Sequence, residues 1–453
     1  MHVAIITAGG AGMFCGSCMH DNTWARALLN AGAEVTLIPT YTPIRVDEGS
    51  LSSQRIFFGG INIYLEHRWK FWQRLPRWMT RWLDHPRLLD LATRGAVSND
   101  AKQLGDLTLE MLAGDSGPQR QQVEELAAFL ADELKPDGIC FSNALLAGAL
   151  PRIQARFSGP VLCTLQGDDI FLDSLTAEYR ARVTAQLSER AQSFDGFLVH
   201  SDYYRDYMAE RLHLPRERFR RIPLGIDVSH HDGRSPDLLD ADSAETRSGQ
   251  GEDFRIGYFA RICPEKGLHV LVEAFRILRK RLPNARLVAG GYLGKRDEAW
   301  FSKLRREAKD LGDSFEYIGS PPDHESKVAF LKTLDVLSVP TVYREPKGLF
   351  ALEAMANGIP VVLPAHGAFP EMVGRSEGGR LFTPGQPEEL ATTLEELLKN
   401  PINRAQLARK GHQRVREFFS AEVMARESLA VFEEYLARPG AMSRAPAEDA
   451  DTA

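Results

Sequence analysis

The stretch that decides the fold is residues 338–373, which read SVPTVYREPKGLFALEAMANGIPVVLPAHGAFPEMV. An apolar run at 335–339 leads into it and predicts a buried parallel strand. After a loop, Gly348 opens an apolar-periodic helix, which Gly358 and Pro360 end. A further strand follows at 360–363, and a second loop then leads into another helix. The stretch therefore predicts a strand–helix–strand unit of an α/β fold.

Two carboxylates, Glu345 and Glu353, bracket the junction of the first loop and the helix, with seven residues between them. Free N–H groups at a helix start favour an anion, so the turn at Gly348, Leu349 and Phe350 can take a phosphate. Carboxylates beside a phosphate need another purpose, and accepting hydrogen bonds from sugar hydroxyls is a natural one. The stretch predicts a cradle for a nucleotide diphosphate joined to a sugar. The alternative is a solvated pair of glutamates on an ordinary turn, but the loop glycines and the second loop favour the cradle.

The whole motif runs from Glu345-Pro-Lys-Gly-Leu through Leu-Glu353-Ala-Met-Ala-Asn-Gly-Ile-Pro-Val-Val to Gly367 and Pro370-Glu371. It resembles the signature of the glycogen-synthase-like retaining glycosyltransferases, family 4. A motif of this length is far more specific than a lone glycine-rich loop. The resemblance implies an α/β fold of the GT-B type, in which two Rossmann-like domains face each other across a cleft. It also implies a C-terminal helix that returns to the N-terminal domain.

Length and composition agree with a soluble globular protein. The chain has 453 residues, of which 43% are hydrophobic and 26% charged, so we expect two to three domains. The net charge of −6 argues against general nucleic-acid binding. The apolar start is too short for a signal peptide and no apolar run reaches membrane-spanning length, so we expect a cytoplasmic protein.

The five cysteines are an odd number and do not form a disulfide framework. Cys15 and Cys18 make a C-x-x-C motif, but neither a thioredoxin-like surrounding nor two further zinc ligands accompany it. No spaced acidic motif for a metal is visible either. We therefore expect no metal site.

The N-terminal segment reads as strand 3–7, a glycine-rich loop 9–18, helix 22–30 and strand 34–39. The glycine spacing is not the strict dinucleotide fingerprint, and no acidic residue closes the second strand, so an NAD-dependent oxidoreductase is weakly supported. The resemblance places this loop near the donor phosphates and the acceptor. Gly12 and Gly16 are the candidate substrate-binding positions because a bare backbone can approach a ligand there. A tight turn without a ligand is an equal alternative.

A predicted strand at 161–165 ends at Gln166, Gly167, Asp168 and Asp169. Ligands bind at such strand ends in parallel sheets. The family often has a histidine at the Gln166 position that contacts the donor sugar, whereas glutamine keeps the hydrogen bonding but carries no proton. Asp168 is a candidate for assisting the acceptor, and a polar loop that caps the next helix is the alternative.

Residues 67–83 interleave tryptophans with arginines, and Pro76 interrupts a continuous helix there. Three interpretations remain open. The aromatic side chains pack onto their own domain, or they line an acceptor groove, or the segment makes a peripheral contact with an anionic membrane surface.

The second half opens with a strand at 254–259, followed by Arg261 and Lys266. A guanidinium and an ammonium group beside a helix start suit a diphosphate. The resemblance implies that both grip the donor phosphates and stabilise the leaving diphosphate. Two solvated basic residues near a turn are the alternative.

We expect five segments along the chain. These are an acceptor-side domain at 1–227, a linker or insertion at 228–252, a nucleotide-sugar domain at 253–418, a helix crossing back at 419–437, and a disordered tail at 438–453.

The expected activity is transfer of a hexose-type sugar from a nucleotide-diphosphate sugar to a hydroxyl of an unidentified glycan, lipid or small-molecule acceptor. The resemblance implies retention of the anomeric configuration and independence from metals and other cofactors. Arg261, Lys266 and Glu345 are the expected catalytic residues, and Glu353 would hold the ribose hydroxyls. The loop of Gly367, Ala368 and Phe369 would touch the sugar. A hydrolysing epimerase and a noncatalytic sugar-nucleotide-binding protein remain alternatives.

Overall fold

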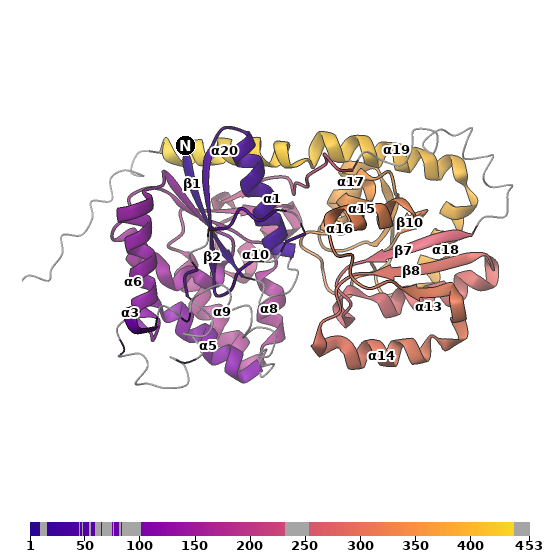
Figure 1. Cartoon of the computed structure of the whole chain (residues 1–453), viewed down its shortest axis with the longest axis horizontal. Helices are drawn as coiled ribbons and strands as arrows, with labels where there is room; N and C mark the ends of the chain where they lie inside the picture. Colours follow the sequence, from indigo (N-terminus) through magenta and orange to yellow (C-terminus); the bar gives the residue numbers. More distant parts are fainter. Residues whose placement is uncertain are drawn as a thin grey trace, which may run out of the picture. The chain divides into compact units, whose positions relative to one another are not determined.

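The computed structural model describes residues 1–9, 16–44, 46–47, 49–53, 56–58, 65, 75, 77–80, 83, 101–231 and 253–438. The chain divides into two compact units (Figure 1). One unit combines Met1–Pro223 with the chain from Met424 onward, and the other is Leu224–Val423.

In the first unit, the described residues form a sheet of six parallel strands in the order β2-β1-β3-β4-β5-β6. The strands are β1 (His2–Ala8), β2 (Glu34–Thr40), β3 (Gly138–Phe141), β4 (Val161–Thr164), β5 (Gly196–Val199) and β6 (Phe219–Arg221). The strands β3, β4 and β5 are buried along their whole length. They are short apolar runs because a parallel sheet is covered on both faces.

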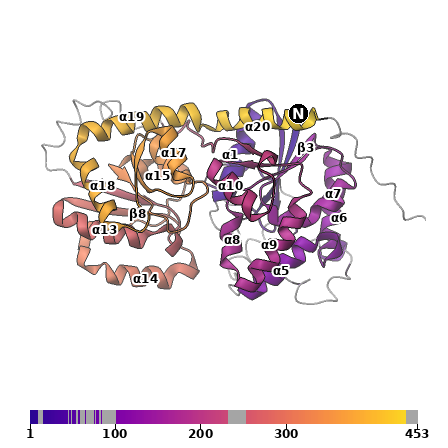
Figure 2. The same cartoon turned by 180° about the vertical axis from the view of Figure 1, so that it is seen from behind.

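Helices connect these strands, as the reverse view also shows (Figure 2). They are α1 (Gly16–Asn30), α3 (Arg77–Thr80), α5 (Ala101–Ala113), α6 (Arg120–Ala128), α7 (Leu150–Gln154), α8 (Asp168–Ser174), α9 (Ala177–Ala191) and α10 (Asp202–Arg211). The helix α1 begins six residues before the expected start at Asn22, because the polar side chains of its first turns find buried partners in the fold. Phe57 forms an isolated parallel bridge with Thr40 of β2.

The last helix, α20 (Ala421–Leu436), contacts the first unit through its residues from Met424 onward. The indole of Trp24 on α1 donates a hydrogen bond to Ser428 Oγ at 2.8 Å and stacks on Phe432 with the ring centroids 6.3 Å apart. Arg220 of β6 forms a bidentate pair with Glu434, at 2.7 and 3.0 Å. A buried aromatic anchor and an ion pair thus hold this helix to the sheet unit that the chain left at Pro223.

The second unit contains six parallel strands among its described residues, in the order β12-β11-β10-β7-β8-β9. The strands are β7 (Phe254–Phe259), β8 (Ala285–Gly290), β9 (Phe315–Tyr317), β10 (Val336–Leu337), β11 (Val361–Pro364) and β12 (Gly379–Phe382). The helices are α13 (Leu268–Arg281), α14 (Glu298–Glu307), α15 (His324–Lys332), α16 (Leu349–Ala356), α17 (Phe369–Ser376), α18 (Pro387–Lys399) and α19 (Pro401–Phe418). Both views place α15 and α17 on one face of the sheet, with α13 and α14 on the other (Figures 1 and 2). Figure 1 shows α16 on the same face as α15 and α17. The α/β class expected from the sequence is confirmed.

Each sheet has one point where the strand order reverses. In the first unit this point lies between β1 and β3, and in the second between β7 and β10. The chain leaves two such strands toward opposite faces, which opens a crevice beyond their carboxyl ends where ligands of α/β proteins bind. In the second unit, the loops that follow β7 and β10 carry Arg261, Lys266 and Glu345. The topology therefore brings these loops together.

Candidate active site

The loop after β7 packs directly against the loop after β10. The N–H of Val342 donates to the carbonyl of Glu265 at 2.9 Å. Gly267, which has a φ of 76°, lies so close to Pro340 that any side chain would collide with the proline carbonyl oxygen. The sequence needs glycine here because L-residues avoid this conformation and because no room exists for a Cβ. This contact fixes Lys266 next to the residues that follow Pro340.

Lys266, Tyr343 and Glu345 form a triangle of hydrogen bonds. The ammonium of Lys266 donates to Glu345 Oε2 at 2.5 Å and to the Tyr343 hydroxyl at 2.6 Å. The same hydroxyl donates to Glu345 Oε2 at 2.5 Å. The ammonium also lies 5.1 Å from the centroid of the Tyr343 ring, within the range of a cation–π contact. Lys266, expected to bind the phosphates, and Glu345, expected to bind the sugar, are thus direct partners.

Glu345 is a buried carboxylate that keeps its charge. Burial raises the pKa of its carboxyl, but the charge and hydrogen bond of Lys266, together with the Tyr343 hydroxyl, leave the pKa below its ordinary value. Its second oxygen, Oε1, accepts only a long bond of 3.4 Å from the N–H of Lys347 among the contacts resolved here. The side chain is 6% exposed, against 17% for Lys266, so the lysine is the more accessible partner.

Arg261 stands on the same loop as Lys266. Its Nε donates to Cys263 Sγ at 3.3 Å, and its carbonyl accepts a bond from the Tyr258 hydroxyl at 3.1 Å. Burial and Glu345 raise the pKa of Tyr343 well above its ordinary value, and the charge of Arg261 acts in the opposite direction. Arg261 is therefore close enough to influence the triangle electrostatically, as a shared anion site requires.

The helix α16 begins beside this triangle. Gly348 precedes its first residue, Leu349, and Phe350 is buried with the Lys266 ammonium 5.5 Å from its ring centroid. The start of a helix offers backbone N–H groups and a partial positive charge. Together with Lys266 and Arg261 it makes this end of the second sheet suited to an anion.

Glu353, on the same helix, has a buried basic partner that the motif did not indicate. Lys327 on α15 donates to Glu353 Oε1 at 2.7 Å. The two side chains are 5% and 9% exposed, respectively. In the described contacts, Lys327 thus occupies one of the two oxygens of the Glu353 carboxylate.

The loop after β11 packs against the loop after β10, which carries Glu345. Gly367, with a φ of 62°, lies against the backbone of Glu345, where a Cβ would collide. The N–H of Ala368 donates to the Glu345 carbonyl at 2.8 Å. Phe369 is fully buried and Glu371 lies in the first turn of α17. The loop therefore holds Glu345 in position, and the Phe369 ring belongs to the core.

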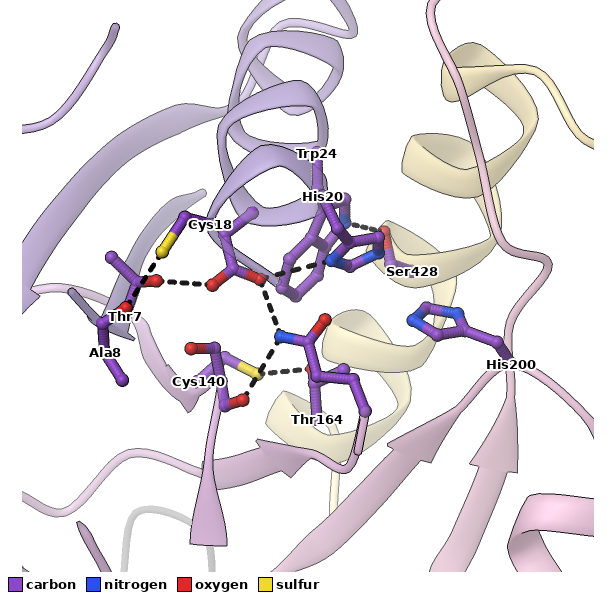
Figure 3. Close-up of polar contacts among 12 residues, drawn as sticks. Thr7, Ala8, Cys18, His20, Trp24, Cys140, Thr164, His200 and Ser428 are labelled. Atoms are coloured by element: carbon purple, nitrogen blue, oxygen red, sulfur yellow. Dashed lines mark hydrogen bonds and ion pairs between the residues drawn. The ribbon is translucent and has the colours of Figure 1, made fainter. Parts of the chain in front are cut away.

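In the first unit, Gln166 belongs to a buried polar cluster. Its amide nitrogen donates to Asp21 Oδ1 at 2.9 Å and to the Ser142 carbonyl at 3.2 Å. Asp21 is fully buried and also accepts a bond of 2.5 Å from the Thr7 hydroxyl. The cluster continues to His20, whose ring lies edge-on to His200 with the centroids 4.6 Å apart (Figure 3). Gln166 is thus fixed by partners from α1 and from the loop after β3.

Asp168 and Asp169 are also buried and hydrogen-bonded within the unit. Asp168 accepts from the N–H groups of Ala144 and Gln166, at 2.8 and 3.2 Å. Burial raises the pKa of Asp168 to about 6, although these N–H groups oppose the shift. Asp169 accepts from the Tyr204 hydroxyl at 2.6 Å. These bonds give both residues a structural role.

Two predicted features fall wholly or partly outside the described residues. Gly12 lies outside them, and Gly16 is the exposed first residue of α1. In segment 67–83, the structure describes the helix Arg77–Thr80, with Met79 46% exposed and Thr80 buried, and the isolated positions 75 and 83. The side chains of the tryptophans and arginines in this segment lie outside the described part, so its three interpretations stay open.

Three residues of these networks were not among the candidates from the sequence. Tyr343 stands two residues before Glu345. Residues at this spacing share a side in an extended segment, so the sequence could have indicated Tyr343 as a neighbour of Glu345. No such indication existed in the sequence for Lys327 or Asp21, because each is distant along the chain from its partner, Glu353 or Gln166.

In the described ranges, no group of three or more His, Cys, Asp and Glu side chains could hold a metal ion. Among the described helices, none is long and apolar enough to cross a membrane.

Two protein-family models match the sequence. The model "Glycosyl transferases group 1" matches residues 242–414, and the model "Glycosyltransferase Family 4" matches residues 115–230. The chain belongs to the GT-B glycosyltransferases of the family 4 type. The first match contains Arg261, Lys266, Glu345 and Glu353, and the second contains Gln166.

One relative is mannosylfructose-phosphate synthase of Agrobacterium fabrum, 27% identical over 243 residues, which are 50% of each chain. The chain thus spans about half the length of this curated relative. Among solved structures, sucrose-phosphate synthase from Thermosynechococcus elongatus superposes with a TM-score of 0.67 at 19% identity, over 96% of this chain and 98% of that one. The Anabaena protein HepE in complex with UDP gives 0.65 at 16% identity, over 96% and 100%. At these identities the structural matches speak for the fold alone.

Proposed function

We propose that this protein transfers a hexose-type sugar from a nucleotide-diphosphate sugar to an acceptor hydroxyl, with retention of the anomeric configuration and without a metal. The observation that carries the proposal is the meeting of Arg261, Lys266 and Glu345 at the reversal point of the second sheet, beside the start of α16. A cation for a diphosphate, Lys266, and a carboxylate for sugar hydroxyls, Glu345, are hydrogen-bonded there, with Arg261 on the same loop as Lys266.

In this mechanism, negative charge grows on the departing diphosphate as the sugar becomes oxocarbenium-like. Arg261 and Lys266 stabilise that charge, helped by the N–H groups at the start of α16. Glu345 orients the donor sugar and Glu353 holds the ribose hydroxyls. The leaving phosphate accepts the proton of the attacking acceptor hydroxyl, so no separate protein base is needed.

The names of the similar proteins support a sugar nucleotide as the donor. HepE was solved in complex with UDP, and mannosylfructose-phosphate synthase is named for a sugar phosphate product. The acceptor is a glycan, a lipid or a small molecule, and the first unit, with Asp168, is its proposed binding side.

A thermal-shift screen against UDP-, GDP- and ADP-sugars tests this proposal. We expect the nucleotide sugars of one nucleobase to raise the melting temperature. With an acceptor present, the enzyme should then release the free nucleoside diphosphate even in EDTA. NMR of the product should show the same anomeric configuration as the donor. Release of free sugar without an acceptor would instead indicate a hydrolysing epimerase. Binding without turnover on a broad acceptor panel would indicate a noncatalytic binding protein.

A further inference from the structure

The hydroxyl of Tyr343 joins the two charged residues of the proposed site. It accepts a hydrogen bond from Lys266 at 2.6 Å and donates one to Glu345 at 2.5 Å. A phenylalanine would fill the same space without these bonds. The hydroxyl therefore acts only through the bridge between cation and carboxylate.

Lys266 and Tyr343 occupy one oxygen of Glu345, and a sugar hydroxyl must compete with the ammonium for that oxygen. This oxygen, Oε2, receives both the ammonium and the tyrosine hydroxyl. The ammonium adds the attraction of opposite charges to its hydrogen bond, which a neutral sugar hydroxyl lacks, so the hydroxyl competes poorly for Oε2. A free sugar is then a weak ligand of this oxygen.

A diphosphate changes the competition because it carries more negative charge than a single carboxylate. Lys266 is the partner that can move, since it has a flexible stem and is 17% exposed against 6% for Glu345. Once the ammonium turns to the phosphates, the buried carboxylate needs new donors. Sugar hydroxyls supply them, and the Tyr343 hydroxyl remains as the donor that keeps Oε2 in place.

We propose that Tyr343 is a positioning residue that couples recognition of the diphosphate to recognition of the sugar. This inference rests on the proposed function and adds to it a binding order. The diphosphate engages Lys266, and only then does Glu345, held by Tyr343, accept the sugar hydroxyls. The sugar therefore contributes affinity only when it arrives attached to, or together with, the nucleoside diphosphate.

Titration calorimetry on the full chain tests the coupling, with UDP against UDP-glucose and GDP against GDP-mannose as probes. In the wild type, we expect the sugar nucleotide to bind more tightly than the matching diphosphate. In Tyr343→Phe, the Kd of the diphosphate should change by less than about threefold and that of the sugar nucleotide should rise about tenfold, the usual effect of losing a hydrogen bond to a charged group.

The matched control is Tyr179→Phe. It removes a tyrosine hydroxyl that donates to a carboxylate, Asp106, at 2.6 Å, but in the other unit. It should leave the ratio of the two Kd values at the wild-type level. The coupling would be overturned if the ratio of the two Kd values in Tyr343→Phe stayed at the wild-type level. An equal loss of affinity for both ligands has the same meaning.

A second measurement needs no variant and therefore holds even if Tyr343→Phe does not fold. Saturation-transfer NMR with glucose and the wild type should show binding with saturating UDP and none without it. Equal signals with and without UDP, or no signal under either condition, would contradict the inference. If no nucleotide binds the wild type in calorimetry, the proposed function itself fails, and this outcome is distinct from binding without coupling.

Discussion

Lys327 on α15 and Glu353 on α16 form an ion pair of 2.7 Å in which both side chains are more than nine-tenths buried. The pair joins two helices that lie on the same face of the second sheet (Figure 1). Because a buried charge is tolerated only with a partner, each side chain balances the charge of the other. The glutamate proposed to hold ribose is therefore part of the packing as well as of the site.

Replacing Lys327 with methionine keeps most of the side-chain length and removes the charge. We expect the free energy of unfolding to fall by about 3 kcal/mol, since the Glu353 carboxylate is left buried without this partner. Urea unfolding at neutral pH measures the change. The double variant Lys327→Met/Glu353→Met should recover most of the loss, and a double variant less stable than the single one would contradict this account.

Lys266→Ala and Glu345→Ala should each lower kcat/KM for sugar transfer at least about 100-fold, because each removes a group that interacts with the reacting donor. Circular dichroism should show an intact fold. Lys303→Ala is the control, since Lys303 pairs with Glu307 at 3.7 Å on the exposed face of α14. Turnover near the wild-type rate in either site variant would refute the assignment.

Gly367→Ala should lower activity about tenfold or more, because the added methyl group collides with the backbone of Glu345 and displaces it. Gly385→Ala is the matched control. Gly385 has a similar φ of 74°, but nothing lies within 4 Å of the position of its Cβ. Both variants should lose about 1 kcal/mol from the left-handed backbone conformation, as thermal melting can measure. Equal activities of the two would show that this close approach is unimportant.

Asp168 should make stability depend on pH. Its folded-state pKa, about 6, lies above the ordinary value of 3.8, so the folded protein holds a proton that the unfolded chain has released. The contribution of this group is thus fully present at low pH and falls as the pH rises through 6. Relative to Asp168→Asn, the wild-type free energy of unfolding should fall by about 2 kcal/mol from pH 4 to pH 7. A difference that is constant over this range would exclude the predicted titration.

Much of the fold could be predicted from local patterns. Buried parallel strands such as 161–164 and 361–364 are short apolar runs bounded by turn residues, and the helix after Gly348 follows an apolar period that Gly358 ends. The start of α1 was placed too late, because the residues from Gly16 to Asp21 carry few local helix signals and are held by tertiary contacts. The pairing of Phe57 with Thr40 likewise depends on a neighbour distant in sequence.

The sequence by itself determined which residues could serve chemistry. Spacing and residue type single out Glu345, Glu353, Arg261 and Lys266, because cations for phosphate and acids for hydroxyls are properties of the side chains themselves. Only the tertiary structure decided their partners. The adjacency of β7 and β10 brings Lys266 against Glu345 and Tyr343, and the packing of α15 on α16 gives Glu353 its lysine. The physical reason is that charge pairing depends on distances of a few ångströms, which strand order and packing set across many residues of chain.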